Sequence, residues 1–234
     1  MANSMNAKYL AIFFGLTICL ISSNLDAEMY VDRSIVIFEA GGPQREDVKV
    51  SNTGDEVIYI QVDVFSVLNP GTEEEERVKV TDPKELKLIA TPNKMVIPAG
   101  GQKLIRIVNL ESNNTVERVH RINVTPIVAP LSEETSQLRI VVAYQILTIV
   151  QPVSPQSKLL ATRSGNVVKF ENQGSSNILL SEGSQCKPDD STACDDLPSR
   201  RLYAGNTWEL GLPFDAPLAY SVRTFDGIKK QIIK

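Results

Sequence analysis

Residues 137–151 read Q-L-R-I-V-V-A-Y-Q-I-L-T-I-V-Q, a stretch with no charge after Arg139 and no glycine or proline. Its β-branched residues favour a β-strand, which as one piece would be about 45 Å long. Most strands have about 5–6 residues, so this one is longer than a small β-sandwich can cover. An uncovered apolar strand promotes aggregation unless another chain pairs with it. The stretch therefore indicates a strand that is lent to a partner protein.

The N-terminus has the pattern of a secretory signal peptide. Lys8 precedes an apolar run over residues 9–21, and small and polar residues then lead to Ala27. A short positive region, an apolar core of about 7–15 residues and a small residue at the cut are typical of such peptides. The run is also shorter than the roughly 20 residues of a membrane span. We expect cleavage near Ala27 and export of a protein that is not embedded in the membrane, with a retained anchor as the weaker alternative.

Composition and motifs exclude several functions. A pI of about 5.2 and a net charge of −4 give no clustered basic face of the kind that binds nucleic acid. There is no phosphate-binding loop and no paired metal motif. The only histidine, His120, would have to be the base of any serine triad, and no G-x-S-x-G motif accompanies it. We predict a protein that is not an enzyme and needs no cofactor or metal.

Two cysteines remain after the expected signal peptide is removed. Cys19 lies inside that peptide, which leaves Cys186 and Cys194 on either side of a short polar segment. An even pair in an exported chain is typical of a disulfide, and closing so short a loop stabilises the fold by roughly 2–3 kcal/mol. We predict a Cys186–Cys194 disulfide.

Alternating apolar residues and turn signals predict strands throughout the rest of the chain. About seven short strands with turns every 8–12 residues are typical of an immunoglobulin-like sandwich, and this pattern occurs twice. The predicted fold is all-β, with two immunoglobulin-like β-sandwich domains joined by a short linker that contains Pro152 and Pro155. The predicted segments are a signal peptide at 1–27, a first domain at 28–151 and a second domain at 152–234. The strands expected with most detail are 31–38, 58–64, 104–108, 119–128, 167–171, 178–180, 207–212, 219–224 and 231–233.

Several short motifs occur in a distinctive order. They are D-R-S at 32–34, A-T-P at 90–92, I-P-A-G at 97–100, E-R-V at 117–119 and N-V at 123–124. Together they resemble the PapD-like periplasmic pilus chaperones, and the resemblance covers nearly the whole chain after residue 27. It implies a two-domain protein that resides in the periplasm and caps pilus subunits before they are assembled.

Three further features resemble the alternative subgroup of this family, which serves class-5-type fimbriae. They are N-P-G-T-E-E at 69–74, V-H-R at 119–121 and the cysteine pair. The conventional subgroup is the second possibility. The acidic residues 73–76 are expected to belong to a solvated loop.

The resemblance implies donor-strand complementation. In this family a subunit is an immunoglobulin-like domain without its last strand, and the chaperone's strand fills the apolar groove until an outer-membrane usher receives the subunit. Main-chain hydrogen bonds then give pairing, and alternate side chains give specificity. The implied partners are fimbrial subunits and, through the complex, the usher. The alternative function is an exported immunoglobulin-like binding module or an adhesin component of the pilus. The predicted groove-filling residues are Leu138, Ile140, Val142 and Tyr144, unless this face packs into the chain's own core.

Members of the family also bind the subunit's terminal carboxylate with two basic residues between the domains. Matching the motifs places Ile35 and Leu147 at these two positions, and neither side chain can bind a carboxylate. A buried carboxylate still needs a charged donor. The resemblance therefore favours Arg121 as the replacement and Arg33 as the second candidate, with a solvated surface side chain as the alternative for each.

A last set of charged residues matches an interdomain feature of the family. Arg106, Glu117 and Asp226 correspond to a buried charge cluster that ties the two domains together. The resemblance implies a structural role for this cluster, because it would fix the angle between the domains.

Overall fold

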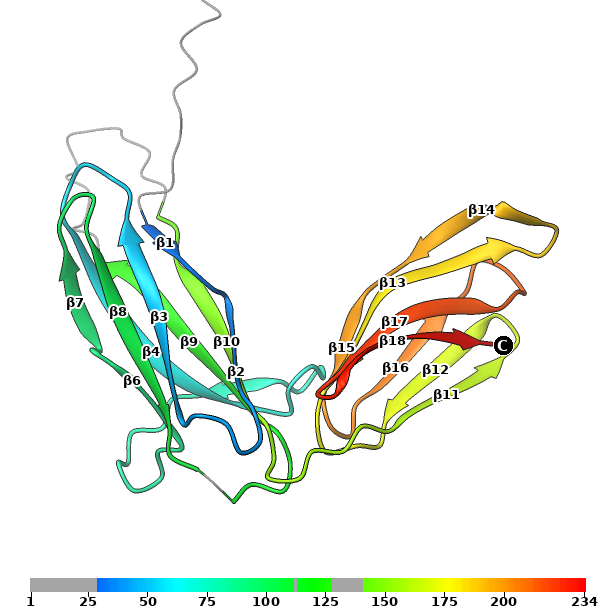
Figure 1. Cartoon of the computed structure of the whole chain (residues 1–234), viewed down its shortest axis with the longest axis horizontal. Coiled ribbons are helices and arrows are strands. Elements are labelled where there is room, and N and C mark those ends of the chain that lie inside the picture. Colours follow the sequence, from blue (N-terminus) through cyan, green and yellow to red (C-terminus); the bar gives the residue numbers. More distant parts are fainter. Residues whose placement is uncertain (1–28, 112, 128–140) are drawn as a thin grey trace, which may run out of the picture.

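The computed structural model describes residues 29–111, 113–127 and 141–234, which form two β-sandwiches that meet at one end (Figure 1). The predicted all-β fold with two sandwich domains is confirmed. Within these ranges there is no helix with the length and hydrophobicity that a membrane crossing requires. The predicted signal peptide lies outside the described residues.

The first domain packs two sheets around one apolar core. Ile60, Ile107 and Ile122 are fully buried in this core, and each such side chain contributes about 1.5–3 kcal/mol by leaving water. One sheet has the strand order β1-β3-β8-β6, and the other has the order β2-β10-β9-β4-β5 with β7 also paired to β4. The strands are β1 (Met29–Val31), β2 (Ile35–Phe38), β3 (Arg45–Asn52), β4 (Ile58–Leu68), β5 (Glu76–Val78), β6 (Leu88–Thr91), β7 (Lys94–Ile97), β8 (Gln102–Asn109), β9 (Arg118–Ile127) and β10 (Tyr144–Val150).

The second domain is a smaller sandwich with its own core. Phe170 and Tyr220 are fully buried there, and their rings meet edge to face. A sheet of order β11-β12-β16 faces one of order β14-β13-β17-β18, to which β15 adds by pairing with β13. The strands are β11 (Leu159–Ser164), β12 (Val167–Asn172), β13 (Ile178–Lys187), β14 (Asp190–Leu197), β15 (Arg200–Leu202), β16 (Thr207–Gly211), β17 (Leu218–Thr224) and β18 (Gly227–Ile233). The predicted boundary between residues 151 and 152 lies between β10 and β11.

The predicted first strand, 31–38, is in fact two strands that belong to different sheets. β1 pairs with β3, whereas β2 pairs in parallel with β10. The change occurs at Asp32, whose N–H donates to the Lys49 carbonyl and whose carboxylate accepts the Lys49 N–H, both at 3.0 Å. These two bonds end the pairing with β3, so the chain is free to cross to the other sheet.

The predicted strand 137–151 is also shorter where the structure describes it. β10 begins at Tyr144, and residues 141–143 precede it without regular structure. Tyr144 lies opposite Val124, so an extended strand would place Val142 opposite Pro126. Proline has no N–H for the ladder, which explains why pairing with β9 stops here.

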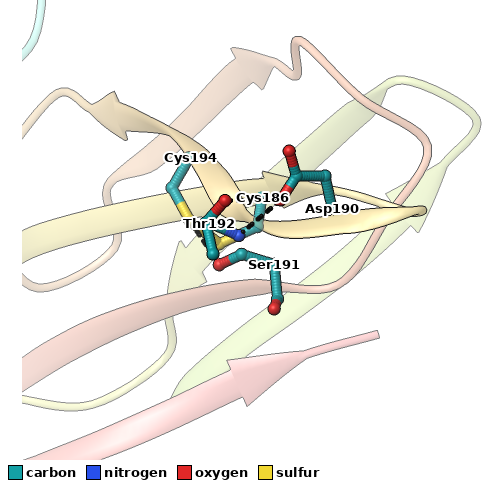
Figure 2. The surroundings of a disulfide bond; sticks show 5 residues. All are labelled: Cys186, Asp190, Ser191, Thr192 and Cys194. Atoms are coloured by element: carbon teal, nitrogen blue, oxygen red, sulfur yellow. Dashed lines mark hydrogen bonds between the residues drawn. A yellow bond between two sulfur atoms is a disulfide. The ribbon is translucent and has the colours of Figure 1, made fainter.

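The predicted disulfide is confirmed and joins two strands rather than closing a loop. Cys186 and Cys194 lie directly opposite each other on β13 and β14. Figure 2 shows the bond beside the turn, where the Asp190 carboxylate accepts hydrogen bonds from the N–H and hydroxyl of Thr192 at 2.9 and 2.6 Å. The polar composition of this segment concealed a hairpin.

The two domains meet through an apolar cluster. Tyr203 follows β15 and packs with Val67, Val119, Leu147 and Ile149 of the first domain, and all five side chains are buried. Because β4, β9 and β10 each contribute to this cluster, the outer face of the larger sheet of domain one faces domain two.

The loop after β4 also reaches the second domain. The Pro70 carbonyl accepts a hydrogen bond from Asn206 Nδ2 at 2.8 Å. Gly71 has a φ of 75°, and a Cβ added there would lie 2.8 Å from Asn206 Nδ2 and 2.9 Å from Tyr203 Cδ2. The loop is therefore not simply solvated, as its acidic run had suggested. Glu75 is half-buried and accepts the Gly71 N–H at 2.9 Å.

Replacing Gly71 tests whether this contact holds the domains together. We expect Gly71→Ala to separate the domains, because the new methyl group collides with Tyr203 and Asn206. The expected result is a larger radius of gyration by X-ray scattering and faster proteolysis of the 151–158 segment. Gly100→Ala is the matched control, since its φ is 66° with open space around it, and it suffers only the left-handed strain of about 1–2 kcal/mol. Equal scattering curves for the two variants would contradict the expectation.

Candidate functional site

Part of β10 has an unpaired edge. β9 pairs with β10 over its full length, whereas β2 pairs only with Leu147–Val150. On the β2 side, residues 144–146 thus have no strand partner within the part of the chain that the structure describes. Unpaired N–H and C=O groups of this kind are a template for another strand.

The predicted groove-filling residues fall into three groups. Leu138 and Ile140 lie outside the described residues. Val142 is 40% exposed, and its neighbour Val141 is 41% exposed. Tyr144 is half-buried, packs against the core of domain one and donates its hydroxyl to the Met29 carbonyl at 2.9 Å. Tyr144 therefore fills the chain's own sandwich, which is the alternative that the sequence left open.

The second half of β10 is covered on both faces. Ile146 and Val150 belong to the core of domain one, and Leu147 and Ile149 belong to the interdomain cluster. Burial on both faces explains the continuous apolar run in this part of the sequence. It also anchors the strand firmly beyond the exposed residues.

Four side chains form a row across the outer face of the larger sheet. Ile35 lies beside Leu147, Leu147 lies beside Arg121, and Arg121 lies beside Phe65. Side chains at such positions are direct neighbours across strands. The structure thus places Arg121 next to the two positions at which the family motifs carry basic residues.

Arg121 lies where the two domains meet. Its Nε is buried and has no hydrogen-bond partner among the described residues. Its charge acts on Glu75, whose pKa is held low chiefly by the Gly71 N–H and further by Arg77 and Arg121. Burial raises the pKa of Tyr203, and nearby arginines, Arg121 among them, act in the opposite direction.

Arg33 has a different environment. It follows the crossing at Asp32, and its Nη1 donates to Glu46 of β3 at 3.2 Å. Its side chain is 45% exposed, and this surface pair contributes at most about 1 kcal/mol. The structure brings Arg33 to the smaller sheet of domain one and not to Arg121.

The three residues of the predicted charge cluster each have different partners among the described residues, so they do not form one network. Arg106 binds both carboxylate oxygens of Asp47, at 2.9 and 3.1 Å. Asp47 lies directly opposite Arg106 on β3, which accounts for this choice of partner. Asp226 accepts a hydrogen bond from the Thr224 hydroxyl at the β17–β18 turn.

Glu117 alone of the three crosses the interface. Its Oε2 accepts the main-chain N–H of Asn177 at 3.0 Å and the Asn177 side-chain amide at 2.6 Å. Arg201 donates in turn to Asn177 Oδ1. Burial raises the pKa of Glu117, and the hydrogen bonds from Asn177 act against this. No sequence signal pointed to Asn177 or Arg201, because they lie far from any motif of the first domain.

His120 is a buried core residue. Its side chain faces into the sandwich, where Nδ1 lies 3.4 Å from the Ser66 hydroxyl. Burial, aided by the charge of Arg118, lowers the pKa of His120 to about 4. The imidazole is therefore neutral at pH 7.

The first domain matches a known family. Residues 28–156 match the family described as pili and flagellar-assembly chaperone, PapD N-terminal domain, and this is more than half of the chain. The chain therefore belongs to the PapD-like pilus chaperones. These are assembly chaperones and not enzymes, as predicted.

Two fimbrial proteins of Escherichia coli are similar in sequence. The B protein of CS1 fimbriae is 33% identical over 145 residues, and the A protein of CFA/I fimbriae is 28% identical over 137 residues. The matches cover 55% and 54% of this chain and 60% and 56% of those proteins. The chain thus spans less than two thirds of the length of these relatives in the matched region.

Solved structures share the complete two-domain fold. The class 5 fimbriae chaperone CfaA is 20% identical with a TM-score of 0.65, and the match covers 88% of this chain and 99% of that one. The SafB chaperone, solved with the SafA pilin of Salmonella enterica, is 15% identical with a TM-score of 0.63 and coverage of 89% and 96%. Together with the sequence relatives, these structures confirm the predicted similarity to the class-5 type.

The single histidine offers a direct test of the packing of β9. We expect its ring protons to titrate near pH 4 by NMR, because protonation would place a charge inside the core. The unfolded chain takes up this proton near pH 6.5. The contribution to stability, on the order of 3 kcal/mol, is therefore complete above pH 6.5 and is lost as the pH falls toward 4. His120→Asn should lack this pH dependence, and a titration near pH 6.5 would show that the side chain is exposed.

Proposed function

We propose that this chain is a periplasmic chaperone that folds and caps fimbrial subunits and delivers them to an outer-membrane usher. The observation that carries the proposal is the unpaired edge of β10 at residues 144–146, preceded by the exposed Val141 and Val142. Family membership supports it. So do two relatives in fold: SafB, solved in complex with a pilin, and a chaperone–tip adhesin complex of CFA/I fimbriae.

The proposed mechanism is donation of the strand that leads into β10. A pilus subunit that lacks a strand pairs with the free edge by main-chain hydrogen bonds, and alternate side chains enter its groove. Leu138, Ile140 and Val142 are the proposed groove-filling residues, each contributing about 1.5–3 kcal/mol before ordering costs. Tyr144 and the rest of β10 hold the donated segment to its own domain.

Arg121 is the proposed anchor for the subunit's terminal carboxylate. It lies beside Ile35 and Leu147, and its buried Nε has no hydrogen-bond partner within the described chain. An arginine in this state is suited to bind a carboxylate through two parallel hydrogen bonds. The ion pair of Arg33 with Glu46 makes Arg33 the weaker candidate.

The proposed location follows from the N-terminal sequence. Residues 1–27 are proposed to direct export and to be removed near Ala27, which leaves domains at 28–151 and 152–234. The usher is the proposed acceptor of the chaperone–pilin complex.

Purification from the periplasm tests strand donation. With a tag after Lys234, we expect a one-to-one complex with a small pilin-like protein, identified by mass spectrometry. Ile140→Asp and Val142→Asp should remove this protein, because a carboxylate cannot enter an apolar groove. Val153→Asp is the control, since Val153 is 60% exposed but lies beyond β10. If the wild-type chain is recovered alone while pili are being made, it is instead an exported binding module.

A second pair of variants tests the anchor. We expect Arg121→Ala to abolish subunit capture while the thermal unfolding midpoint stays within a few degrees of the wild type, because the side chain forms no hydrogen bond within the described chain through Nε. Arg33→Ala should leave capture unchanged. Normal capture by Arg121→Ala would refute the assignment, and loss of capture in Arg33→Ala alone would move the anchor to Arg33.

A further inference from the structure

We propose that the carboxylate site spans both domains, with Arg201 of the second domain as the second cation beside Arg121. The inference rests on the proposed function, because the ligand is the terminal carboxylate of a pilus subunit. Its basis is the arrangement of charged side chains at the interface, where the two motif positions that are basic in the family hold Ile35 and Leu147.

The first observation is the position of Arg201. It lies on β15 opposite Leu179 of β13, and Tyr203 follows two residues later. Tyr203 packs on Leu147 in the interdomain cluster, and Leu147 is the direct neighbour of Arg121 in the row across the larger sheet. Arg201 and Arg121 therefore approach the same apolar contact from opposite domains.

The second observation is how Arg201 is held. Its Nη1 donates to Asn177 Oδ1, and Asn177 donates two hydrogen bonds to Glu117 of the first domain. This chain of bonds fixes the guanidinium at the interface but uses only one of its two terminal nitrogens. A guanidinium has five N–H donors, so most of the binding capacity of Arg201 remains for a ligand.

The third observation is the excess of positive charge at this point. Burial lowers the pKa of Arg201, and the charges of Arg223 and Arg121 lower it further. The two nearby carboxylates are engaged elsewhere: Glu75 binds the Gly71 N–H and Arg77, and Glu117 binds Asn177. An added anion would offset the repulsion among the arginines.

The shape of the donors selects the kind of anion. Leaving the buried Nε of Arg121 without a partner is costly, and the planar fork of a guanidinium matches the two oxygens of a carboxylate. Ile35, Leu147 and Phe65 provide apolar surface around Arg121. The ligand best suited to this site is a chain terminus whose last side chain is apolar. Because its two cations come from different domains, binding of this ligand also fixes the angle between them.

A charge-removing variant tests the role of Arg201 in capture. Arg201→Gln keeps a donor for Asn177 but removes the charge, and we expect recovery of the co-purified pilin-like protein to fall about tenfold or more. Arg200→Gln is the matched control, since Arg200 is the exposed neighbour that stacks near Trp208 instead. Both variants should show the scattering curve of the wild type. Normal capture by Arg201→Gln would overturn the two-domain site.

A second measurement does not depend on any pilus subunit. The arginine side-chain Nε–H signals of the full chain are followed by NMR while N-acetyl-leucine is added, with uncharged N-acetyl-leucinamide as the control. We expect the Arg121 and Arg201 signals to shift with the carboxylate and not with the amide, and the effect on Arg121 to weaken in Arg201→Gln. A shift of Arg121 alone, or equal shifts with both compounds, would overturn the proposal. If the wild-type chain captures no pilin, the chaperone function fails, while this titration still decides whether the arginines form a carboxylate site.

Discussion

The parallel pairing of β2 with only the second half of β10 is the constraint on which the rest of the structure depends. It exists because Asp32 ends the pairing of β1 with β3 and lets the chain cross between the sheets. If β2 ran the full length of β10, the sheet edge would be closed and no partner strand could add to it. If the crossing were absent, Leu147 and Ile149 would lose a neighbouring strand, and the exposed segment before Tyr144 would have no rigid base.

The same register organises the contact between the domains. Successive residues of β10 point alternately to the core of domain one and to domain two, so Ile146 and Leu147 serve different surfaces although they are adjacent. The row that starts at Ile35 carries this alternation across the sheet to Arg121. The position of one arginine at the interface is thus a consequence of sheet register, and a shift by one residue would turn it into the core.

Features that depend on local chemistry could be predicted from the sequence. Alternation and turn residues identify strands, and two cysteines in an exported chain identify a disulfide, because each signal lies within a few residues. Partners across sheets or domains could not be predicted in this way. Arg106 matched a family position, but its partner is Asp47, which the register of β3 and β8 places opposite it. Asn177, Arg201 and Tyr203 reach the site only because the second domain packs there, and no spacing in the sequence encodes that contact.

Strand addition and carboxylate binding have different physical roles in the proposed complex. Main-chain pairing along the edge of β10 is nearly the same in any register, since every residue offers one donor and one acceptor. Apolar side chains at alternate positions of the donated segment fit a groove in every second register, because a shift by two residues restores the same face. A charged terminus fixed near Leu147 removes this ambiguity, since only one register places the last residue of the partner between Arg121 and Arg201. The anchor therefore sets the register, and the strand supplies most of the buried area.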